Sequence, residues 1–354
     1  MNGTIAAQTP LARLMTAQIR ATGPMTVAEF MALALGHPEH GYYTTRDPFG
    51  AAGDFITAPE VSQMFGELIG LWAAQVWVGA GRPTPVRLVE LGPGRGTLMA
   101  DALRAAAGSG LAEAAEVWFV ETSPVLRRAQ AERVPEARVA ATLAEIPEGP
   151  LLLIANEFLD ALPVRQYLAS PEGWRERLVS LAGDRLAFAL SPPLPGGMPT
   201  QPWAEHSPAA EAVVAEIARR VDGDGLAALL IDYGYTRATR PAGPTLQALS
   251  GHAPADPLAA PGEADLTWLV DFDALAAAFA GPVRQTTQGA FLAALGIGAR
   301  AEALARGSPE RAEEVAEALE RLTASGGMGG FRVLAAGRAG APVPPGFETP
   351  LSAP

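Results

Sequence analysis

Apolar positions at helical spacing open the chain. Residues 9–35 carry such a pattern on one face, and Gly23-Pro24 interrupts it. Residues 36–60 lose the pattern and contain several Gly, Pro and Asp residues, which predicts a loop. The segment Glu60–Val78 is almost continuously apolar, so we expect it to form a long buried helix.

The middle of the chain alternates short apolar runs with helical segments. The predicted strands are Val86–Leu91, Val117–Val120, Arg138–Ala140, Leu151–Ala155 and Leu226–Asp232. Helices are predicted after the first two strands, at residues 97–107 and 124–131. Strands separated by helices in this rhythm predict an α/β fold, in which a parallel sheet is covered by helices on both faces.

Several other segments depart from this rhythm. Residues 164–190 suggest antiparallel strands, and the Pro- and Gly-rich residues 240–264 are typical of a surface insertion or lid. Phe331–Leu334 is expected to be the last strand. We therefore predict the following organisation: an N-terminal helical extension at 1–80, a core domain at 81–340 with insertions at about 164–210 and 240–270, and a flexible tail at 341–354.

Composition limits the class of protein. Hydrophobic residues make up 49% of the 354-residue chain and charged residues 18%, so a substantial core can be buried. Every apolar run is shorter than the roughly 18 to 20 residues of a membrane span, and we expect neither a span nor a secretory signal. Residues 1–28 contain no acid and carry Arg13 and Arg20, a weak likeness to a transit peptide; a first helix is the preferred interpretation.

Charge and metal-binding residues exclude further classes. The net charge of −12 argues against a nucleic-acid partner, because such partners are bound mainly through phosphate neutralisation. The chain has no Cys, so disulfides, thiolate catalysis and Cys-ligated metals are excluded. Four His residues occur, and the pair His37 and His40 has Pro38 between them, so no metal site is predicted.

A glycine-rich loop follows the first predicted strand. Gly92, Gly94 and Gly96 lie between this strand and a helix, where glycine lets the backbone approach a ligand closely. Their G-x-G-x-G spacing differs from the G-x-G-x-x-G of dinucleotide-binding proteins, which must cradle a pyrophosphate. S-adenosylmethionine has no pyrophosphate, so this loop favours S-adenosylmethionine as the cofactor. A purely structural turn is the alternative.

Acidic residues close the first two strands. Glu121, with Thr122 beside it, ends the second strand, where a carboxylate can bind ribose hydroxyls. Glu90 ends the first strand and is expected to contact the methionine amino group or the glycine loop; a buried structural carboxylate is the alternative.

Polar residues after the fourth strand are candidates for the methyl-acceptor site. Asn156, Glu157 and Asp160 follow the strand, and ligands of open α/β sheets lie beyond the carboxyl ends of strands. A carboxylate can bind a guanidinium group bidentately and fix its plane. Acids that merely decorate a helix N-terminus are an equally simple explanation.

Two more acids are candidates for the same region. Asp232 ends the fifth strand and is expected to line the acceptor site beside Asn156, Glu157 and Asp160. Asp54, in the segment Gly53–Thr57, is expected to approach the cofactor or acceptor, with a local turn as the alternative.

The sequence resembles the MidA-like methyltransferases over nearly its whole length. The matching stretches are Gly41–Tyr43, Gly53–Ile69, Glu90–Leu98, Ala155–Pro163, Ile231–Tyr235, Pro261–Leu266, Asp271-Phe272, Gln288-Gly289 with Phe291-Leu292, and Met328-Gly329. The block GDFITAPEVSQMFGE is far more specific to this group than the glycine loop.

The resemblance implies a fold and a reaction. It implies a seven-stranded class I methyltransferase fold with a helical extension and an inserted lid, and S-adenosylmethionine as methyl donor. By analogy with mitochondrial members, it implies methylation of an arginine on a quinone-oxidoreductase subunit, in the assembly of respiratory complex I. Gly92, Gly94, Gly96 and Glu121 are implied as cofactor contacts.

The same resemblance extends to the acceptor site, where it implies Asp54, Asn156, Glu157 and Asp160. We expect a bacterial, cytoplasmic protein. The sequence leaves its oligomeric state open, and a homodimer is one of the possibilities. Two alternatives to an arginine methyltransferase are an assembly chaperone that retains a cofactor pocket and a nicotinamide oxidoreductase. The loop spacing disfavours the oxidoreductase.

Overall fold

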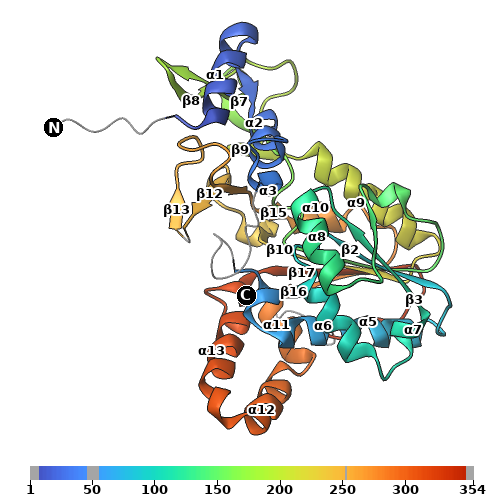
Figure 1. The fold of residues 1–354 in the computed structure, drawn as a ribbon. Helices are drawn as coiled ribbons and strands as arrows, with labels where there is room; N and C mark the ends of the chain where they lie inside the picture. The colour runs from blue at the N-terminus through green and yellow to red at the C-terminus, as the bar shows by residue number, and fades with distance from the viewer. Residues whose placement is uncertain (1–7, 46–55, 252, 348–354) are drawn as a thin grey trace. The chain divides into compact units, whose positions relative to one another are not determined.

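The computed structural model describes residues 8–45, 56–251 and 253–347. Its contacts divide the chain into two compact units, each assembled from separate stretches of sequence (Figure 1). Unit 1 comprises Met1–Phe55, Asp160–Glu211 and Thr239–Leu269, and unit 2 comprises Ile56–Leu159, Ala212–Ala238 and Val270–Pro354.

A seven-stranded sheet forms the centre of unit 2, with the order β16-β17-β10-β5-β2-β3-β4. The strands are β2 (Val86–Leu91), β3 (Ala115–Val120), β4 (Arg138–Ala140), β5 (Leu151–Asn156), β10 (Ala227–Asp232), β16 (Val283–Thr287) and β17 (Arg332–Gly337). The five strands from β4 to β10 are parallel, whereas β17 is antiparallel to both β10 and β16. The predicted α/β class and the five parallel strands are confirmed. Strand β16 was not predicted.

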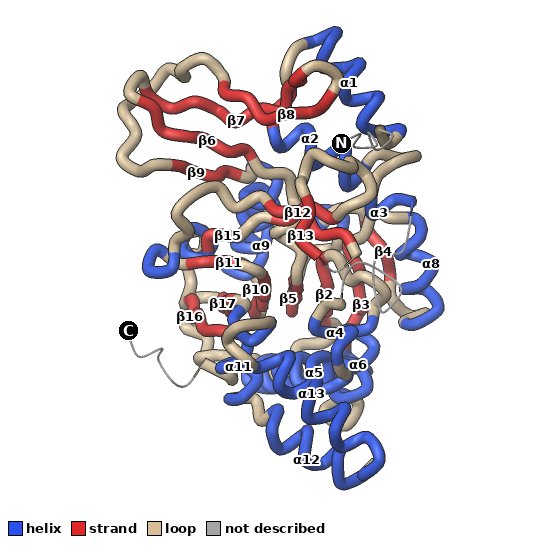
Figure 2. Tube along the Cα trace, turned by 90° about the vertical axis from the view of Figure 1, so that its left-hand side faces the viewer, coloured by secondary structure: helices blue, strands red, loops and turns tan. Residues whose placement is uncertain are grey.

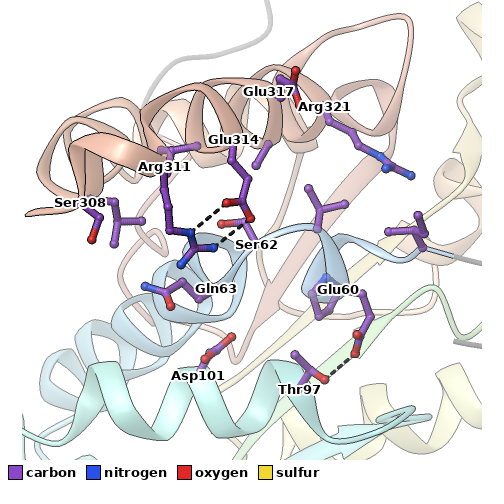
Figure 3. A pocket seen from close by; sticks show the side chains of 16 residues that line it. Glu60, Ser62, Gln63, Thr97, Asp101, Ser308, Arg311, Glu314, Glu317 and Arg321 are labelled. Atoms are coloured by element: carbon purple, nitrogen blue, oxygen red, sulfur yellow. Dashed lines mark hydrogen bonds and ion pairs between the residues drawn. The ribbon is translucent and has the colours of Figure 1, made fainter. Parts of the chain in front are cut away.

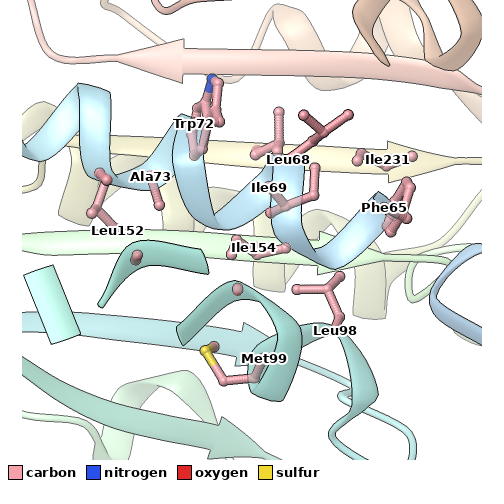
Figure 4. Close-up of a cluster of buried hydrophobic side chains, with 14 of the residues drawn as sticks. Phe65, Leu68, Ile69, Trp72, Ala73, Leu98, Met99, Leu152, Ile154 and Ile231 are labelled. Atoms are coloured by element: carbon pink, nitrogen blue, oxygen red, sulfur yellow. The ribbon is translucent and has the colours of Figure 1, made fainter. Parts of the chain in front are cut away.

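Helices pack on this sheet, and two of them lie side by side on one face, as Figures 2 and 4 show. They are α5 (Gln63–Gly79) and α6 (Thr97–Ala106). A Cβ on Gly70 of α5 would lie 2.3 Å from the carbonyl oxygen of Ala102 in α6, so this close approach requires glycine. The other helices are α4 (Ala58–Val61), α7 (Leu111–Ala114), α8 (Pro124–Arg133), α9 (Pro208–Asp222), α10 (Phe272–Ala276), α11 (Gln288–Ala294), α12 (Ile297–Gly307) and α13 (Ala312–Thr323).

The apolar core of unit 2 lies between α5, α6 and the sheet (Figure 4). Its labelled members are Phe65, Leu68, Ile69, Trp72 and Ala73 of α5, Leu98 and Met99 of α6, Leu152 and Ile154 of β5, and Ile231 of β10. Each large side chain buried in this way contributes roughly 1.5–3 kcal/mol. The core therefore fixes the ends of β2, β5 and β10, after which the candidate site residues follow.

The predicted helix Glu60–Val78 is wrong at its start. Helix α4 ends at Val61, and Ser62 adopts an extended conformation with φ −162°. The Ser62 hydroxyl accepts a hydrogen bond from the backbone N–H of Met64 at 3.2 Å and so caps α5, which begins at Gln63. An apolar run alone could not reveal this break, because Ser is compatible with a helix interior.

Unit 1 contains two antiparallel sheets. The larger has the order β1-β7-β6-β9, with β8 paired to β7; the smaller has the order β13-β12-β14. The strands are β1 (Met25–Thr26), β6 (Arg165–Ser170), β7 (Gly173–Ala182), β8 (Arg185–Leu190), β9 (Trp203–His206), β12 (Gln247–Ser250), β13 (Ala253–Ala255) and β14 (Asp265–Thr267). The antiparallel strands predicted within 164–190 are confirmed.

The interruption predicted at Gly23-Pro24 is confirmed. Residues 9–35 form two helices, α1 (Pro10–Thr22) and α2 (Val27–Gly36), and Thr26 and Glu29 form a capping box that starts the second. Within the insertion predicted at 240–264, the structure contains the short strands β12 and β13. A short α3 (Tyr42–Thr45) also replaces part of the loop predicted at 36–60.

Candidate functional site

The glycine loop connects β2 to α6 in a conformation that favours glycine. Gly92, Gly94 and Gly96 all have positive φ angles, of 58°, 54° and 79°. A Cβ on Gly92 would lie 2.7 Å from the Phe158 ring, closer than side-chain atoms approach in proteins. Backbone conformation therefore favours glycine at all three positions, and space requires it at Gly92.

The carboxylate of Glu90 lies at the end of β2 and is buried, with 3% of the residue exposed. Its Oε2 atom has no hydrogen-bond partner among the described residues. Burial without a charged neighbour raises the pKa of Glu90 to about 8. An ammonium group, such as that of the methionine part of S-adenosylmethionine, carries the positive charge and the donors that suit this carboxylate, so the residues present fit the cofactor.

Glu121, after β3, is held by the backbone that follows it. One carboxylate oxygen accepts hydrogen bonds from the N–H groups of Thr122 and Ser123, each at 2.7 Å. Burial raises the pKa of Glu121, although these bonds oppose the shift. Thr122 itself is exposed, and its backbone N–H is what contacts Glu121. A carboxylate fixed in this way is suited to accept hydrogen bonds from ribose hydroxyls.

Gln130 of α8 was not identified from the sequence. Its Nε2 atom donates to the carbonyl oxygen of Gly94 at 2.7 Å and to Oε2 of Glu121 at 3.3 Å. The residue is completely buried. The sequence gives one indication of its burial. Gln130 lies four residues after Leu126, so the two residues share the inward face of α8.

Glu157 follows β5 with φ 50°, a conformation that is unfavourable for residues other than glycine. Its backbone N–H donates to the carbonyl of Ile231 at 2.8 Å. Its carboxylate oxygen Oε1 accepts hydrogen bonds from the backbone N–H of Ala58 at 3.2 Å and from Nδ2 of Asn156 at 3.1 Å. The side chains of Asn156 and Glu157 are thus brought together beside the start of α4.

Asp232 fixes the backbone of the same segment. It ends β10 and is 1% exposed. Its Oδ2 atom accepts hydrogen bonds from the N–H groups of Phe158 at 3.2 Å and Leu159 at 2.8 Å, and its Oδ1 atom accepts one from Tyr233 at 2.8 Å. Asp232 therefore holds the segment that follows β5, and its contribution to an acceptor site stays a prediction.

Asp160 belongs to unit 1, whereas Asn156 and Glu157 belong to unit 2. Asp160 is 3% exposed, and its negative charge acts on the hydroxyl of Tyr43. This hydroxyl donates a hydrogen bond to Oδ1 of Asp265 at 2.9 Å. Burial, Asp265 and Asp160 together raise the pKa of Tyr43 well above its usual value. The remaining candidate, Asp54, lies outside the described residues.

A cavity of about 560 Å³ lies beside the glycine loop, within unit 2 (Figure 3). Glu60 of α4 lines it and accepts a hydrogen bond from the hydroxyl of Thr97, the residue after Gly96, at 2.5 Å. On the opposite wall, Arg311 donates two hydrogen bonds of 2.9 Å to Glu314. These charged lining groups are thus paired within the protein.

Metal-binding clusters and membrane-spanning helices are both absent from the described residues. Across residues 8–45, 56–251 and 253–347, no group of three or more His, Asp or Glu side chains could hold a metal ion. None of the helices in these ranges combines the length with the hydrophobicity of a membrane-spanning segment.

Comparison with known proteins shows the family to which the chain is related. The family model described as "Putative S-adenosyl-L-methionine-dependent methyltransferase" matches residues 68–290. The chain is 39% identical over 338 residues to "Protein arginine methyltransferase NDUFAF7, mitochondrial" of Mus musculus, covering 84% of this chain and 76% of that protein. The Homo sapiens protein of the same name is 37% identical over 341 residues, with 84% and 75% covered.

A solved structure agrees as well. A methyl transferase candidate from Burkholderia thailandensis, bound to S-adenosyl-homocysteine, matches with a TM-score of 0.81 and 26% identity over 97% of both chains. The expectation of a cytoplasmic protein is contradicted, because the names of the curated relatives place them in mitochondria. The predicted cofactor and enzyme class are confirmed: the chain belongs to this family of S-adenosyl-L-methionine-dependent methyltransferases.

Proposed function

We propose that the methyl acceptor is the guanidinium group of an arginine in a protein substrate. The observation that carries this proposal is the extent of the likeness to proteins named arginine methyltransferases, which reaches 39% identity over 84% of the chain. By the resemblance found in the sequence, the substrate we propose is a subunit of a respiratory NADH:quinone oxidoreductase.

The cofactor supplies an electrophilic methyl group when it is bound. We assign Glu90 to bind its amino group and Glu121 to bind its ribose hydroxyls. Gly92, Gly94 and Gly96 let the backbone approach the cofactor closely. Thr122 acts through its backbone N–H, which holds the Glu121 carboxylate at 2.7 Å. The unpartnered Oε2 atom of Glu90 supports the first assignment.

The acceptor is assigned to Asn156 and Glu157. A guanidinium nitrogen attacks only when its lone pair is available, so a carboxylate must hold the group and take up the proton that is lost. Glu157 suits this role because Ala58 and Asn156 hold its Oε1 atom in place. Asn156 has a buried Oδ1 atom without a hydrogen-bond partner in the described part of the chain, and this atom suits a guanidinium N–H.

Asp160 and Asp54 are assigned to the acceptor side on the resemblance alone. The limits predicted for the methyltransferase domain, 81–340 with its two insertions, also stay a proposal. The family match spans residues 68–290, so it begins before the predicted N-terminal limit and ends before the predicted C-terminal limit.

Mass spectrometry of protein from cells with and without this gene tests the proposal. Protein from cells that lack the gene is incubated with the purified chain and S-adenosylmethionine. We expect methylarginine to appear on at least one protein that carries it in the parent cells. Methylation confined to other residue types would refute the arginine assignment, and S-adenosylhomocysteine binding without any methyl transfer would favour the chaperone.

A further inference from the structure

The glycine loop and Glu121 follow different strands, yet one buried side chain contacts both. The amide of Gln130 donates to the Gly94 carbonyl at 2.7 Å and to the Glu121 carboxylate at 3.3 Å. Gln130 reaches them from α8, which packs beyond the end of β3. It is therefore the point at which the two parts of unit 2 assigned to the cofactor are joined.

The orientation of this amide is determined by its neighbours. A carbonyl oxygen and a carboxylate both accept hydrogen bonds, so the NH₂ group of Gln130 must face them. Its Oε1 atom is then buried, and it has no hydrogen-bond partner among the described residues. Burying an unsatisfied oxygen costs stability, so an apolar residue would suit packing better at this position. The presence of an amide at this position is explained by the hydrogen bonds that its N–H groups donate to Gly94 and Glu121.

The glycine loop also needs such a contact. Glycine loses more conformational freedom on ordering than any other residue, and the loop contains three glycines with positive φ angles. Backbone bonds hold its two ends, from Gly92 N–H to Val120 and from Gly96 N–H to Pro93. Gln130 holds the middle glycine, Gly94.

We propose that Gln130 is a positioning residue that couples the conformation of the glycine loop to the placement of Glu121. It acts on the cofactor only through these two groups. Its N–H groups order the loop before the cofactor binds, so the loop loses less conformational entropy on binding. They also hold the carboxylate that the ribose is expected to contact.

Calorimetric titration with S-adenosylhomocysteine tests this proposal. Gln130→Met keeps the size of the side chain and removes its donors. We expect the Kd to rise about 10- to 100-fold, the range for losing hydrogen bonds that include one to a charged group. Unliganded protein is also melted, so that any loss of folding is measured separately from the loss of affinity.

Gln288 provides a matched control. It is also completely buried, donates from Nε2 to a backbone carbonyl, that of Leu322, at 3.1 Å, and has an Oε1 atom without a partner in the described residues. It contacts neither the glycine loop nor Glu121. Gln288→Met should lower Tm to a similar degree and leave the Kd within about 2-fold of the parent value. An equal rise in Kd for both variants would overturn the proposal.

A double-mutant cycle with Glu121→Gln separates coupling from general weakening. If Gln130 acts partly by holding Glu121, the two substitutions together should weaken binding by clearly less than the product of their separate effects. Multiplicative effects would show that Gln130 does not act through Glu121 and would overturn the coupling. Should Gln130→Met fail to fold, Gln130→Asn takes its place in the same cycle, since its shortened amide cannot reach both acceptors.

Discussion

The Asp232 carboxylate accepts the backbone N–H of Leu159 at 2.8 Å, so the last residue of β10 holds the segment that follows β5. The same oxygen accepts the N–H of Phe158. Glu157 immediately precedes these residues and has a strained backbone with φ 50°. The hydrogen bonds from Asp232 provide part of the support that such a conformation needs.

We therefore predict that Asp232→Asn impairs turnover more than cofactor binding. The amide can accept on one side only, so at least one buried N–H loses its partner, which costs about 1–3 kcal/mol of stability. Turnover should fall by about 10-fold or more because Glu157 is displaced. Steady-state kinetics and calorimetry with S-adenosylhomocysteine measure the two effects.

Asp222→Asn is the control for this change. Asp222 also accepts two backbone N–H bonds, from Ala280 and Gly281 at 3.2 Å, but in an exposed position. Its substitution should leave turnover within about 2-fold of the parent. A similar loss of turnover in both variants would contradict a specific role for Asp232.

Gly92→Ala should abolish most cofactor binding. The new Cβ would lie 2.7 Å from the Phe158 ring, and the position has φ 58°. Gly23→Ala is the comparison, since Gly23 also has a positive φ, of 91°, but a Cβ added there would meet no described atom within 4 Å. It incurs only the backbone cost, about 1–3 kcal/mol for a residue with φ 91° and ψ −179°. Equal S-adenosylhomocysteine affinities in the two variants would show that the loop tolerates the clash.

Glu90 gives the protein a specific pH dependence. Its pKa rises from about 4.5 to about 8 on burial, so between these values the folded state binds more protons than the unfolded state. The stability contributed by protonated Glu90 is complete below pH 4.5 and is lost as the pH rises through 8. Unfolding of the unliganded protein should therefore require less denaturant at pH 8 than at pH 6, and Glu90→Gln should reduce this difference.

The same group links cofactor binding to proton release. An ammonium group beside Glu90 favours the ionised carboxylate, so binding at pH 7 should release close to one proton. Calorimetry in buffers of different ionisation enthalpy measures this number. Proton release that is unchanged in Glu90→Gln would show that Glu90 is not the group that responds to the cofactor.

Local sequence patterns were sufficient to predict much of the fold. Apolar runs predicted β5 and β10 because every residue of these two strands is buried, and Ser123 with Pro124 marked the start of α8 correctly. Strands β12 and β13 were missed because they are short and lie among Pro and Gly residues, where the pairing of β12 with β13 and with β14 decides the structure. The polar strand β16 was missed for a similar reason: Val283–Thr287 gains its stability by pairing with β17.

Candidate site residues could be proposed from the sequence where residue type and position at or after the end of a strand mark them, and their roles stay predictions. The glycine loop, Glu90, Glu121 and Glu157 are of this kind. Gln130 was missed because a single amide in a polar helix becomes informative only when its neighbours in space are known. The separation of Asp160 from Glu157 into different units was equally invisible, since the two residues are only three positions apart.

We propose that this methyltransferase uses Glu157 to hold a guanidinium group while other residues hold the cofactor. The most direct test compares Glu157→Gln with the control Glu302→Gln, which changes an exposed carboxylate paired with Arg306 at 3.5 Å. Both variants are titrated with S-adenosylhomocysteine and assayed for methylarginine formation. We predict that Glu157→Gln keeps its affinity within about 3-fold and loses at least about 100-fold in methyl transfer, with Glu302→Gln unchanged in both. Methyl transfer retained in Glu157→Gln would show that Glu157 does not hold the acceptor.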